Sequence, residues 1–459
     1  MEYISTRSKK ESFTFKDVFL KGLAPDGGLY VPRKIPSYSS QDLDILRELS
    51  YEQLAIKIIF NYCSDQFSES EIRDLVKKSY KNFSSKDVVN IKKLGDVNLL
   101  ELFHGPTLAF KDIAMQLIGN MYEKILNDKN EVTNIVVATS GDTGAAAISA
   151  LKGKKNLNVF VLHPHNKISK VQRKLMTTVE EKNVFNLAIQ GNFDDCQKLV
   201  KTMFVDQLFN KEVNMSGVNS INWTRIIAQI VYYFFGYFKF YKSGHNINFS
   251  VPTGNFGDVF AGYIAKKMGL PINKLIVATN KNDILKRVIN TGVYKPKEVE
   301  QTISPSMDIQ VASNFERLIF FANLKNDLAT ANTMQELKEN NEFKLSDQLI
   351  SIIKNDFISE SLSEKETKNI IKKINDDYNI LVDPHTAVGI GVLGKIPNEG
   401  INIVLSTAHP CKFPEAVKSA SGRFPSFPFG LEKIMEKKEN FNILPNNLVT
   451  IKKFIKQRI

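Results

Sequence analysis

One lysine in this sequence, Lys111, lies where an amine could become reactive. It follows a β-rich run over residues 97–103 and a Gly105-Pro106 turn, and it immediately precedes a helical pattern that begins at Asp112. The positive amino-terminal end of a helix disfavours a further positive charge, so it lowers the affinity of the amine for its proton. A neutral lysine amine can form a Schiff base with a carbonyl compound. On position alone, a solvated surface lysine is the more common alternative.

Two glycine-containing loops each follow a β-rich run and open a helical pattern. The first loop holds the candidate ligand residues Ser140, Gly141, Asp142 and Thr143. The second holds Gly254, Asn255, Phe256, Gly257 and Asp258. Backbone N–H groups at the start of a helix bind anions, although either loop alone could be only a tight turn. Neither loop matches the G-x-G-x-x-G dinucleotide fingerprint or the G-x-x-x-x-G-K-[ST] phosphate loop, so nicotinamide and nucleoside triphosphate chemistry lose support.

Short β-rich runs alternate with helical patterns from residue 97 onward. This alternation predicts an α/β fold with open, mostly parallel sheets and helices on both faces. The predicted strands are 97–103, 135–138, 159–162, 184–189, 247–251, 275–278 and 401–405. A loop at the carboxyl end of a parallel strand points its N–H groups at whatever anion lies above it. Two such loops together with a suitably placed lysine favour a ligand site.

The composition is that of an ordered globular protein, and 459 residues predict two or three packed domains. The formal net charge is +12, but the lysines are spread along the chain and no compact basic run with aromatic residues occurs. Nucleic-acid binding is therefore not expected. A diffuse positive field would instead favour a phosphorylated small molecule.

Cysteines, histidines and apolar segments exclude several other classes. The three cysteines are far apart, which excludes a disulfide framework and a zinc pattern. His163, His165, His245 and His385 have no metal-ligand spacing with carboxylates, so no metal is expected. The amino terminus lacks the pattern of a secretory signal, and the most apolar segment, 226–240, is too short to span a bilayer and is expected to be a buried helix. We therefore expect a cytoplasmic protein with no membrane association.

Several segments together resemble those of the threonine synthases, within the tryptophan-synthase-β-like, fold type II family of pyridoxal-phosphate enzymes. The segment 104–112, H-G-P-T-L-A-F-K-D, is similar to the motif that carries the cofactor-binding lysine. The loop 139–144 resembles the substrate-side loop of that family, and 254–258 resembles its cofactor-phosphate loop. Further similar segments, in the order of the family, are 220–225, 304–309, 313–317 and 406–413. The segment 22–30 is similar to the branch found in fungi and many bacteria.

The expected domain organisation combines this resemblance with the sequence pattern. A small accessory domain is expected over residues 1–90, followed by a pyridoxal-phosphate-dependent catalytic domain over 91–430 that the resemblance divides into two interleaved α/β subdomains. A charged segment at about 333–377, with helix-spaced apolar residues such as Phe357, predicts solvated surface helices inserted into this domain. Residues 431–459 are expected to form a carboxyl-terminal extension.

The resemblance also implies roles for the candidate residues. Lys111 would hold pyridoxal 5'-phosphate through its amine and, once freed, would move protons at Cα, Cβ and Cγ of the substrate. Residues 254–258 would bind the cofactor phosphate through backbone N–H groups, and the hydroxyl of Thr407 would face the pyridine nitrogen. Residues 140–143 are candidates for the substrate α-carboxylate. The candidates for the substrate phosphate are Asn222, Arg225 and Lys412.

The implied reaction converts O-phosphohomoserine and water into threonine and inorganic phosphate, in a monomer or a homodimer. An O-phosphohomoserine phospho-lyase, which would release 2-oxobutanoate and ammonia, shares the phosphate elimination and is the nearest alternative. Amino-acid dehydratases and cysteine synthases share the fold, but residues 220–225 and 304–309 resemble threonine synthases instead. A catalytically silent binding protein on the same fold would be expected to lack the lysine, whereas Lys111, both glycine loops and Thr407 are intact.

Overall fold

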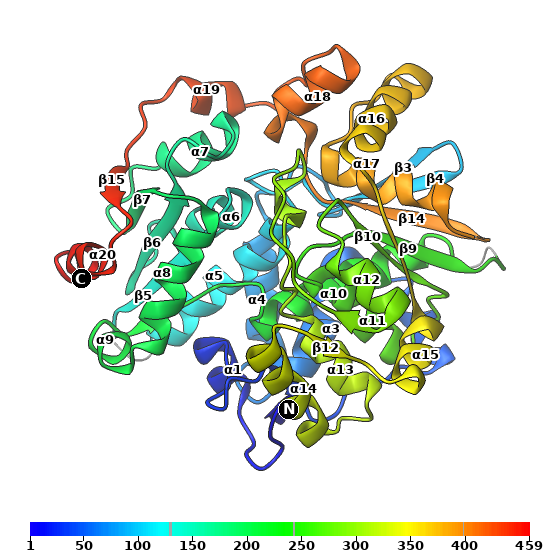
Figure 1. Ribbon diagram of the computed structural model, residues 1–459, viewed down its shortest axis with the longest axis horizontal. Coiled ribbons are helices and arrows are strands. Elements are labelled where there is room, and N and C mark those ends of the chain that lie inside the picture. Colours follow the sequence, from blue (N-terminus) through cyan, green and yellow to red (C-terminus); the bar gives the residue numbers. More distant parts are fainter. Residues whose placement is uncertain (128–130, 242–243, 398) are drawn as a thin grey trace.

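The computed structural model describes residues 1–127, 131–241, 244–397 and 399–459. Two separate sheets form the centre of the molecule and lie beside each other, with helices packed around both (Figure 1). The sequence-based prediction of open, mostly parallel α/β sheets is confirmed. Across the described ranges, no helix has both the length and the apolar composition that crossing a membrane would require.

The larger sheet has six strands in the order β13-β10-β9-β14-β4-β3, and every neighbouring pair is parallel except β3 with β4. Its strands are β3 (Asn90–Leu94), β4 (Val97–Glu101), β9 (Ile247–Pro252), β10 (Leu275–Thr279), β13 (Phe357–Ser361) and β14 (Ile401–Ser406). The central strands β9, β10 and β14 are buried along nearly their whole length, as expected for parallel strands covered on both faces.

The smaller sheet has five strands in the order β15-β7-β6-β5-β8, all parallel. Its strands are β5 (Thr133–Ala138), β6 (Leu157–Pro164), β7 (Val184–Gln190), β8 (Met215–Ser216) and β15 (Asn442–Pro445). Strand β15 comes from the carboxyl-terminal segment that the sequence predicted as an extension. Because it pairs with β7, this segment forms the edge of the smaller sheet.

The helices around the smaller sheet are α5 (Lys111–Asn127), α6 (Asp142–Leu151), α7 (Lys170–Thr177), α8 (Phe193–Val205), α9 (Gln207–Glu212), α19 (Leu431–Glu436) and α20 (Leu448–Lys456). The amino-terminal helices are α1 (Phe15–Lys21), α2 (Ser40–Leu46), α3 (Tyr51–Cys63) and α4 (Glu69–Tyr80). The remaining helices are α10 (Trp223–Phe238), α11 (Gly257–Lys267), α12 (Ile284–Thr291), α13 (Phe315–Ala322), α14 (Asp327–Asn340), α15 (Asp347–Asp356), α16 (Glu364–Tyr378), α17 (Pro384–Gly391) and α18 (Pro414–Ser421). Short 3-10 helices are η1 (Pro305–Met307), η2 (Val392–Lys395) and η3 (Pro410–Lys412).

The aromatic helix α10 joins the two halves of the molecule. It packs against α3, α5 and α11, and it is buried along almost its whole length, which confirms the buried helix predicted for this apolar segment. Its position explains why it is apolar on all sides, because a helix with no solvent-facing side does not need a polar stripe.

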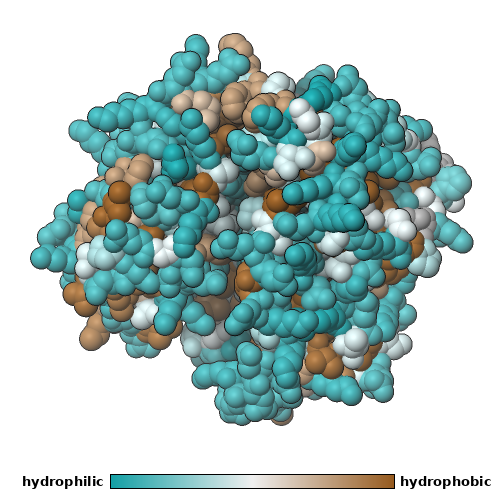
Figure 2. Space-filling model, turned by 45° about the horizontal axis from the view of Figure 1, so that its top comes forward, coloured by the Kyte–Doolittle hydropathy of each residue, from teal (hydrophilic) through white to brown (hydrophobic). Residues whose placement is uncertain are grey.

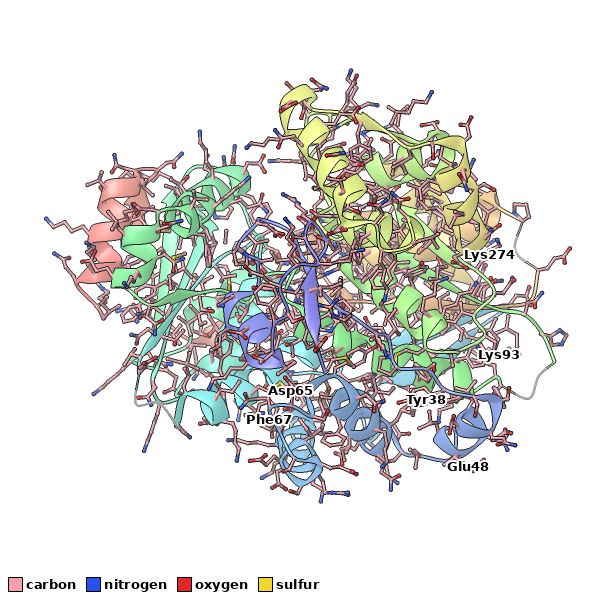
Figure 3. All side chains as sticks on the ribbon, turned by 90° about the horizontal axis from the view of Figure 1, so that it is seen from below. Tyr38, Glu48, Asp65, Phe67, Lys93 and Lys274 are labelled. Atoms are coloured by element: carbon pink, nitrogen blue, oxygen red, sulfur yellow. The ribbon has the colours of Figure 1, made fainter. Side chains whose placement is uncertain are left out.

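The amino-terminal segment is fastened to this core by backbone contacts. Strands β1 (Tyr3–Ser5) and β2 (Tyr30–Pro32) form an antiparallel pair. The buried guanidinium of Arg317 donates hydrogen bonds to the carbonyl of Tyr30, and the N–H of Tyr38 donates to Met268 O at 2.8 Å. Figure 3 shows Tyr38 on the lower side of the molecule. The amino-terminal region therefore packs against α13 and the carboxyl end of α11.

The charged insertion contains two strands, β12 and β13, in addition to its helices. Helices α14, α15 and α16 lie in or near residues 333–377, and a short pair of strands, β11 (Val293–Tyr294) and β12 (Phe343–Lys344), precedes α15. Phe357, which the sequence placed on a helix, instead begins β13 in an extended conformation and is 1% exposed. It follows the buried Ile353 by four residues, so its spacing imitates one more helical turn.

Candidate active site

A cavity of about 130 Å³ opens where the carboxyl ends of β5, β9 and β14 come together. Figure 2 shows a hollow between the two halves of the molecule. Most of the predicted site residues line this cavity: Lys111, Ser140, Asp142, Thr143, Arg225, Gly254, Asn255, Phe256, Gly257, Asp258 and Thr407. Three predicted residues, Gly141, Asn222 and Lys412, are not among its lining residues.

The loop that carries the lysine is shaped by Asp112. The carboxylate of Asp112 accepts hydrogen bonds from the N–H of Thr107 at 2.7 Å and from its hydroxyl at 2.6 Å. A Cβ atom at Gly105 would lie 2.4 Å from the Cβ of Asp112, so only glycine fits beside this carboxylate. Burial is the main influence on Asp112 and raises its pKa to about 6. The contacts of Asp112 with Thr107 and Gly105 thus fix the shape of the loop that carries Lys111.

The same loop is bonded to the end of β14. The N–H of Phe110 donates to Thr407 O at 2.9 Å, and the N–H of His409 donates to Leu108 O at 3.0 Å. These two contacts flank an isolated antiparallel bridge between residues 109 and 408. The lysine at the start of α5 and the threonine after β14 are therefore held next to each other by the backbone, although they are far apart in the sequence.

Lys111 is buried and has a lowered pKa. Burial is the main cause, and the nearby cations Lys412 and Arg225 lower the pKa of Lys111 further. Asp142 opposes them, because its Oδ2 lies 3.4 Å from the Lys111 Nζ. The direction of the shift agrees with the sequence-based argument, but its largest cause is the loss of solvent, which that argument did not include.

Asp142 is the centre of the charges around the lysine. Its Oδ1 accepts from the Nζ of Lys412 at 2.7 Å and from Gln172 Nε2 at 2.8 Å, and its Oδ2 accepts from the hydroxyl of Ser306 at 3.3 Å. Burial alone would raise the pKa of Asp142, but the two lysines hold it well below its usual range. This anionic side chain is already occupied by cations, so it is unsuited to bind the α-carboxylate suggested from the sequence.

The backbone at the start of α6 has fewer free donors than the loop pattern suggested. The hydroxyl of Thr139 accepts from the N–H groups of Gly141 and Gly144, both at 2.9 Å. Gly141 has a φ of 134°, and a Cβ there would lie 2.6 Å from the side chain of Gln172. Its glycine therefore serves the turn. The groups left to meet an anion at this helix start are the Ser140 hydroxyl and the N–H groups of Asp142 and Thr143.

Two of the three residues suggested for the substrate phosphate have other partners. Asn222 caps α10, since its Oδ1 accepts from Thr224 N at 3.0 Å while its Nδ2 donates to Phe19 O at 3.0 Å. Lys412 is 0% exposed, and its Nζ donates to Thr107 O at 2.7 Å in addition to Asp142. Neither Asn222 nor Lys412 lines the cavity, so we expect that neither binds the substrate phosphate.

The loop between β9 and α11 has the open donors that an anion requires. The backbone N–H groups of residues 254–258 have no hydrogen-bond acceptor within the described part of the chain. Asn255 fixes the turn by donating from Nδ2 to Ser220 Oγ at 2.8 Å, and Phe256 has a φ of 63° directly before the helix. A helix start with several free N–H groups is a binding site for phosphate.

Two buried ionisable groups beside this loop have unused polar atoms. Asp258 accepts at Oδ1 from the hydroxyls of Tyr232 at 2.5 Å and Tyr233 at 3.1 Å, while its Oδ2 has no partner. Burial, the largest influence, raises the pKa of Asp258 to about 6. Arg225 has an unpartnered Nε, and burial lowers its pKa to about 10. Arg225 forms no ion pair with any described residue, so this cation can meet an anion in the cavity.

Several residues that line the cavity had no role assigned from the sequence, among them Ser306 and His385. Ser306 belongs to a segment that was quoted only for its resemblance. His385 was considered from the sequence only for metal-ligand spacing. The usable signal was Asp383-Pro384-His385, since an aspartate followed by proline is typical of a helix start that fixes the next side chains.

Comparison with known proteins agrees with this geometry. Residues 2–80 match the profile of the threonine synthase N terminus, residues 92–407 that of the pyridoxal-phosphate dependent enzymes, and residues 386–455 that of the threonine synthase C-terminal region. The threonine synthase of Pseudomonas aeruginosa is 42% identical over 100% of this chain and 98% of its own length. That of Saccharomyces cerevisiae is 41% identical over 98% of this chain and 95% of its own.

Solved structures agree as well. The pyridoxal-phosphate-bound threonine synthase from Brucella melitensis superposes with a TM-score of 0.96 at 43% identity, covering 100% of this chain and 99% of the other. The yeast threonine synthase gives 0.93 at 39% identity, covering 100% and 98%. Because the profile matches and the full-length similarities agree, the chain belongs to the threonine synthase family of pyridoxal-phosphate-dependent enzymes.

Proposed function

We propose that this cavity converts O-phosphohomoserine and water into threonine and inorganic phosphate. One observation supports this most directly: the Lys111 amine shares a single cavity with the open N–H groups of residues 254–258 and with the unpaired Arg225. A reactive amine next to two separate binding sites for anions suits a phosphorylated cofactor together with a phosphorylated substrate.

The residues present fit pyridoxal 5'-phosphate. Lys111 would hold the cofactor through Nζ, the N–H groups of residues 254–258 would bind its phosphate, and the Thr407 hydroxyl would face its pyridine nitrogen. When bound, the cofactor withdraws electrons from the amino acid attached to it, so that protons on the carbon atoms of that amino acid become removable. A hydroxyl beside the ring nitrogen leaves the ring less electron-withdrawing than a carboxylate would, which suits elimination and replacement chemistry.

The substrate would lie between the two sheets. Its α-carboxylate would accept from the Ser140 hydroxyl and from the N–H groups of Asp142 and Thr143 at the start of α6. Its phosphate would meet Arg225, which is positively charged and has no other ion-pair partner among the described residues. The carboxylate of Asp142 would keep its lysine partners and would not bind substrate.

Lys111 would carry the protons of the reaction. Its lowered pKa favours the neutral amine, which can take protons from Cα and Cβ of the substrate and return one at Cγ and one at Cα. The Cγ–O bond to phosphate breaks, and water then supplies the hydroxyl at Cβ. The nearby charge of Asp142 would stabilise Nζ each time it holds a proton.

A product assay tests the proposal. The purified chain with pyridoxal phosphate should release threonine and phosphate in equal amounts from O-phosphohomoserine, and borohydride should attach the cofactor to Lys111. Lys111→Arg keeps a positive charge beside Asp142 but should abolish both results. Release of 2-oxobutanoate and ammonia in place of threonine would indicate a phospho-lyase. Absence of turnover and of cofactor would indicate a binding protein on the same fold.

The wider setting is part of the same proposal. We infer a cytoplasmic enzyme that is a monomer or a homodimer and has no nucleic-acid partner. We also propose an accessory domain over residues 1–90, a catalytic domain over 91–430 and a terminal segment over 431–459. Size-exclusion chromatography with light scattering measures the first property, and limited proteolysis locates the domain boundaries.

A further inference from the structure

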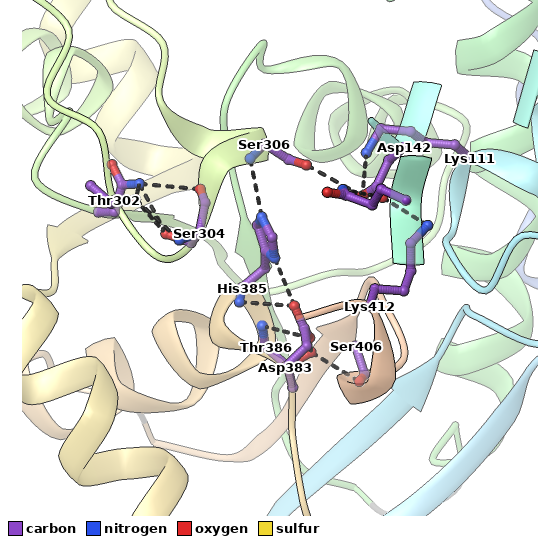
Figure 4. A network of polar contacts seen from close by, with 12 residues as sticks. Lys111, Asp142, Thr302, Ser304, Ser306, Asp383, His385, Thr386, Ser406 and Lys412 are labelled. Atoms are coloured by element: carbon purple, nitrogen blue, oxygen red, sulfur yellow. Dashed lines mark hydrogen bonds and ion pairs between the residues drawn. The ribbon is translucent and has the colours of Figure 1, made fainter. Parts of the chain in front are cut away.

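A chain of polar contacts crosses the cavity from the larger sheet to the smaller one (Figure 4). It begins at Asp383 and His385, where α17 starts beside β9 and β14, passes through Ser306 in η1, and ends at Asp142 on α6. The distances are 2.7 Å from Asp383 Oδ2 to His385 Nδ1, 3.2 Å from Ser306 N to His385 Nε2, and 3.3 Å from Ser306 Oγ to Asp142 Oδ2. The Asp383–His385 contact lies within the start of α17, whereas the two contacts of Ser306 join different elements.

The direction of these bonds is determined by chemistry. A backbone N–H can only donate, so the N–H of Ser306 requires a lone pair on His385 Nε2. The ring proton must then lie on Nδ1, where the carboxylate of Asp383 accepts it. Asp383 is 0% exposed and His385 is 3% exposed. The carboxylate therefore selects the tautomer in which the ring can accept from the cavity segment.

The held segment is part of the cavity wall. Ser306 lies in η1, which lines the cavity together with Ile309, and its carbonyl oxygen lies against the backbone of Gly254 in the loop proposed to bind the cofactor. Its hydroxyl donates to the carboxylate that also contacts Lys111. A shift of the Ser306 backbone would therefore move its hydroxyl away from the carboxylate that contacts the reactive amine.

We propose that His385 is a positioning residue for the reaction. Oriented by Asp383, it holds the backbone of Ser306 so that the Ser306 hydroxyl stays against Asp142 beside Lys111. The inference rests on the proposed function of the cavity. It assigns to His385 a role that acts through Ser306, and His385 does not itself move protons. It also joins the two sheets over the site where substrate would lie.

Two substitutions of His385 test its hydrogen bonds to Asp383 and to Ser306 separately. Asn places its amide near the position of Nδ1, so His385→Asn keeps the contact with Asp383 but cannot reach the Ser306 N–H. Gln places its amide near the position of Nε2, so His385→Gln can still accept from Ser306. Both variants lose the ring contact with Phe413, whose ring centre lies 4.9 Å away. In the cofactor-bound enzyme we expect kcat/KM to fall about tenfold in His385→Asn, the size of one lost hydrogen bond, and to stay within about twofold in His385→Gln.

A double-mutant cycle tests whether the effect passes through Ser306. Ser306→Ala removes the hydroxyl, and adding His385→Asn to it should cause no further loss of kcat/KM. The proposal would be overturned if the losses of kcat/KM in Ser306→Ala and His385→Asn multiplied in the double variant, or if His385→Asn and His385→Gln lost equal amounts. Either result would describe a residue that is needed only for packing.

Hydrogen exchange gives a reading that does not depend on turnover. In cofactor-bound protein without substrate, the peptide that contains Ser306 should exchange faster in His385→Asn than in the parent or in His385→Gln. Unchanged exchange in His385→Asn would refute the contact. If the parent enzyme made no threonine, the proposed function would fail while this comparison still judged the positioning role.

A third variant is available in case His385→Asn does not fold. Asp383→Asn can keep the oxygen that accepts from the N–H of Thr386 at 3.1 Å, but it presents an amide N–H to His385 Nδ1. The ring proton would then move to Nε2 and oppose the Ser306 N–H. Faster exchange of the Ser306 peptide and a similar fall in kcat/KM are expected, and parent-like values of both would overturn the proposal.

Discussion

Lys412 and Asp142 form a buried ion pair, with the Nζ of Lys412 2.7 Å from Asp142 Oδ1. The Lys111 amine lies farther from the same carboxylate, 3.4 Å from Oδ2. Lys412 therefore balances the charge of Asp142, so that the second carboxylate oxygen can serve Lys111. The sequence pattern had suggested a direct contact between Lys412 and the substrate phosphate, whereas the structure gives Lys412 an influence on the reactive amine through Asp142.

Removing Lys412 should destabilise the fold. Lys412→Met leaves a buried carboxylate without its closest cation, and we expect the free energy of unfolding to fall by about 3 kcal/mol. Denaturant unfolding of the cofactor-bound enzyme measures the change. Lys433→Met, at an exposed position of α19, serves as the control and should change little. Adding Asp142→Asn to Lys412→Met should recover part of the loss. Unchanged stability with a raised KM would instead return Lys412 to the role of a phosphate ligand.

Arg225 should behave in the opposite way, because no described residue forms an ion pair with it. Arg225→Met is expected to leave the free energy of unfolding nearly unchanged and to raise KM for O-phosphohomoserine roughly 10- to 100-fold, as for a lost charge-assisted hydrogen bond. Inhibition by inorganic phosphate should weaken in parallel, and Arg225→Lys should lie between parent and Met variant. If Arg225→Met released the cofactor and kept its KM, the guanidinium would belong to the cofactor phosphate.

The sequence was sufficient for features that depend on local pattern. Apolar runs located the central strands β9, β10 and β14, and the lysine segment was placed correctly at the start of α5. Pattern failed where a distant contact decides the outcome. Phe357 continues a helical spacing, but it pairs as the first residue of β13 beside β10, and no local signal encodes that partner.

The same limit applies within the site. Asn222 looked like a polar ligand because it lies within the resembling segment 220–225, yet its amide donates to the carbonyl of Phe19 in the amino-terminal region. His385 carried no metal spacing, and its contact with Ser306 spans 79 positions of the chain. Residue type and spacing predict which side chains can do chemistry, whereas tertiary contacts decide which of them have an unused atom directed at the cavity.

Gly254 should be intolerant of a side chain, for a reason that the sequence did not suggest. A Cβ at Gly254 would lie 2.7 Å from Ser306 O and 3.3 Å from Met307 Cα. Gly254→Ala should push the loop and η1 apart and lower cofactor affinity about tenfold or more, as expected for overpacking against backbone. Equilibrium dialysis measures the affinity, and circular dichroism checks the fold. Gly394→Ala is the control, since a Cβ there meets no atom within 4 Å. Parent-like affinity in folded Gly254→Ala would show that the loop tolerates the displacement.

Thr407 should set the balance between the two possible products. Its backbone carbonyl accepts a hydrogen bond from the N–H of Phe110, and this bond does not depend on the Thr407 side chain. Substitutions at Thr407 can therefore change the cavity while they retain the loop that carries Lys111. Thr407→Asp would place a carboxylate at the proposed position of the pyridine nitrogen and favour the protonated ring, which stabilises more negative charge on the bound amino acid. Threonine formation should fall, and 2-oxobutanoate should rise as a share of turnover, when both are measured by chromatography from one reaction mixture. Thr407→Ser keeps the hydroxyl and should keep the product ratio of the parent. A folded, active Thr407→Asp variant with that same ratio would mean that this side chain does not face the ring nitrogen.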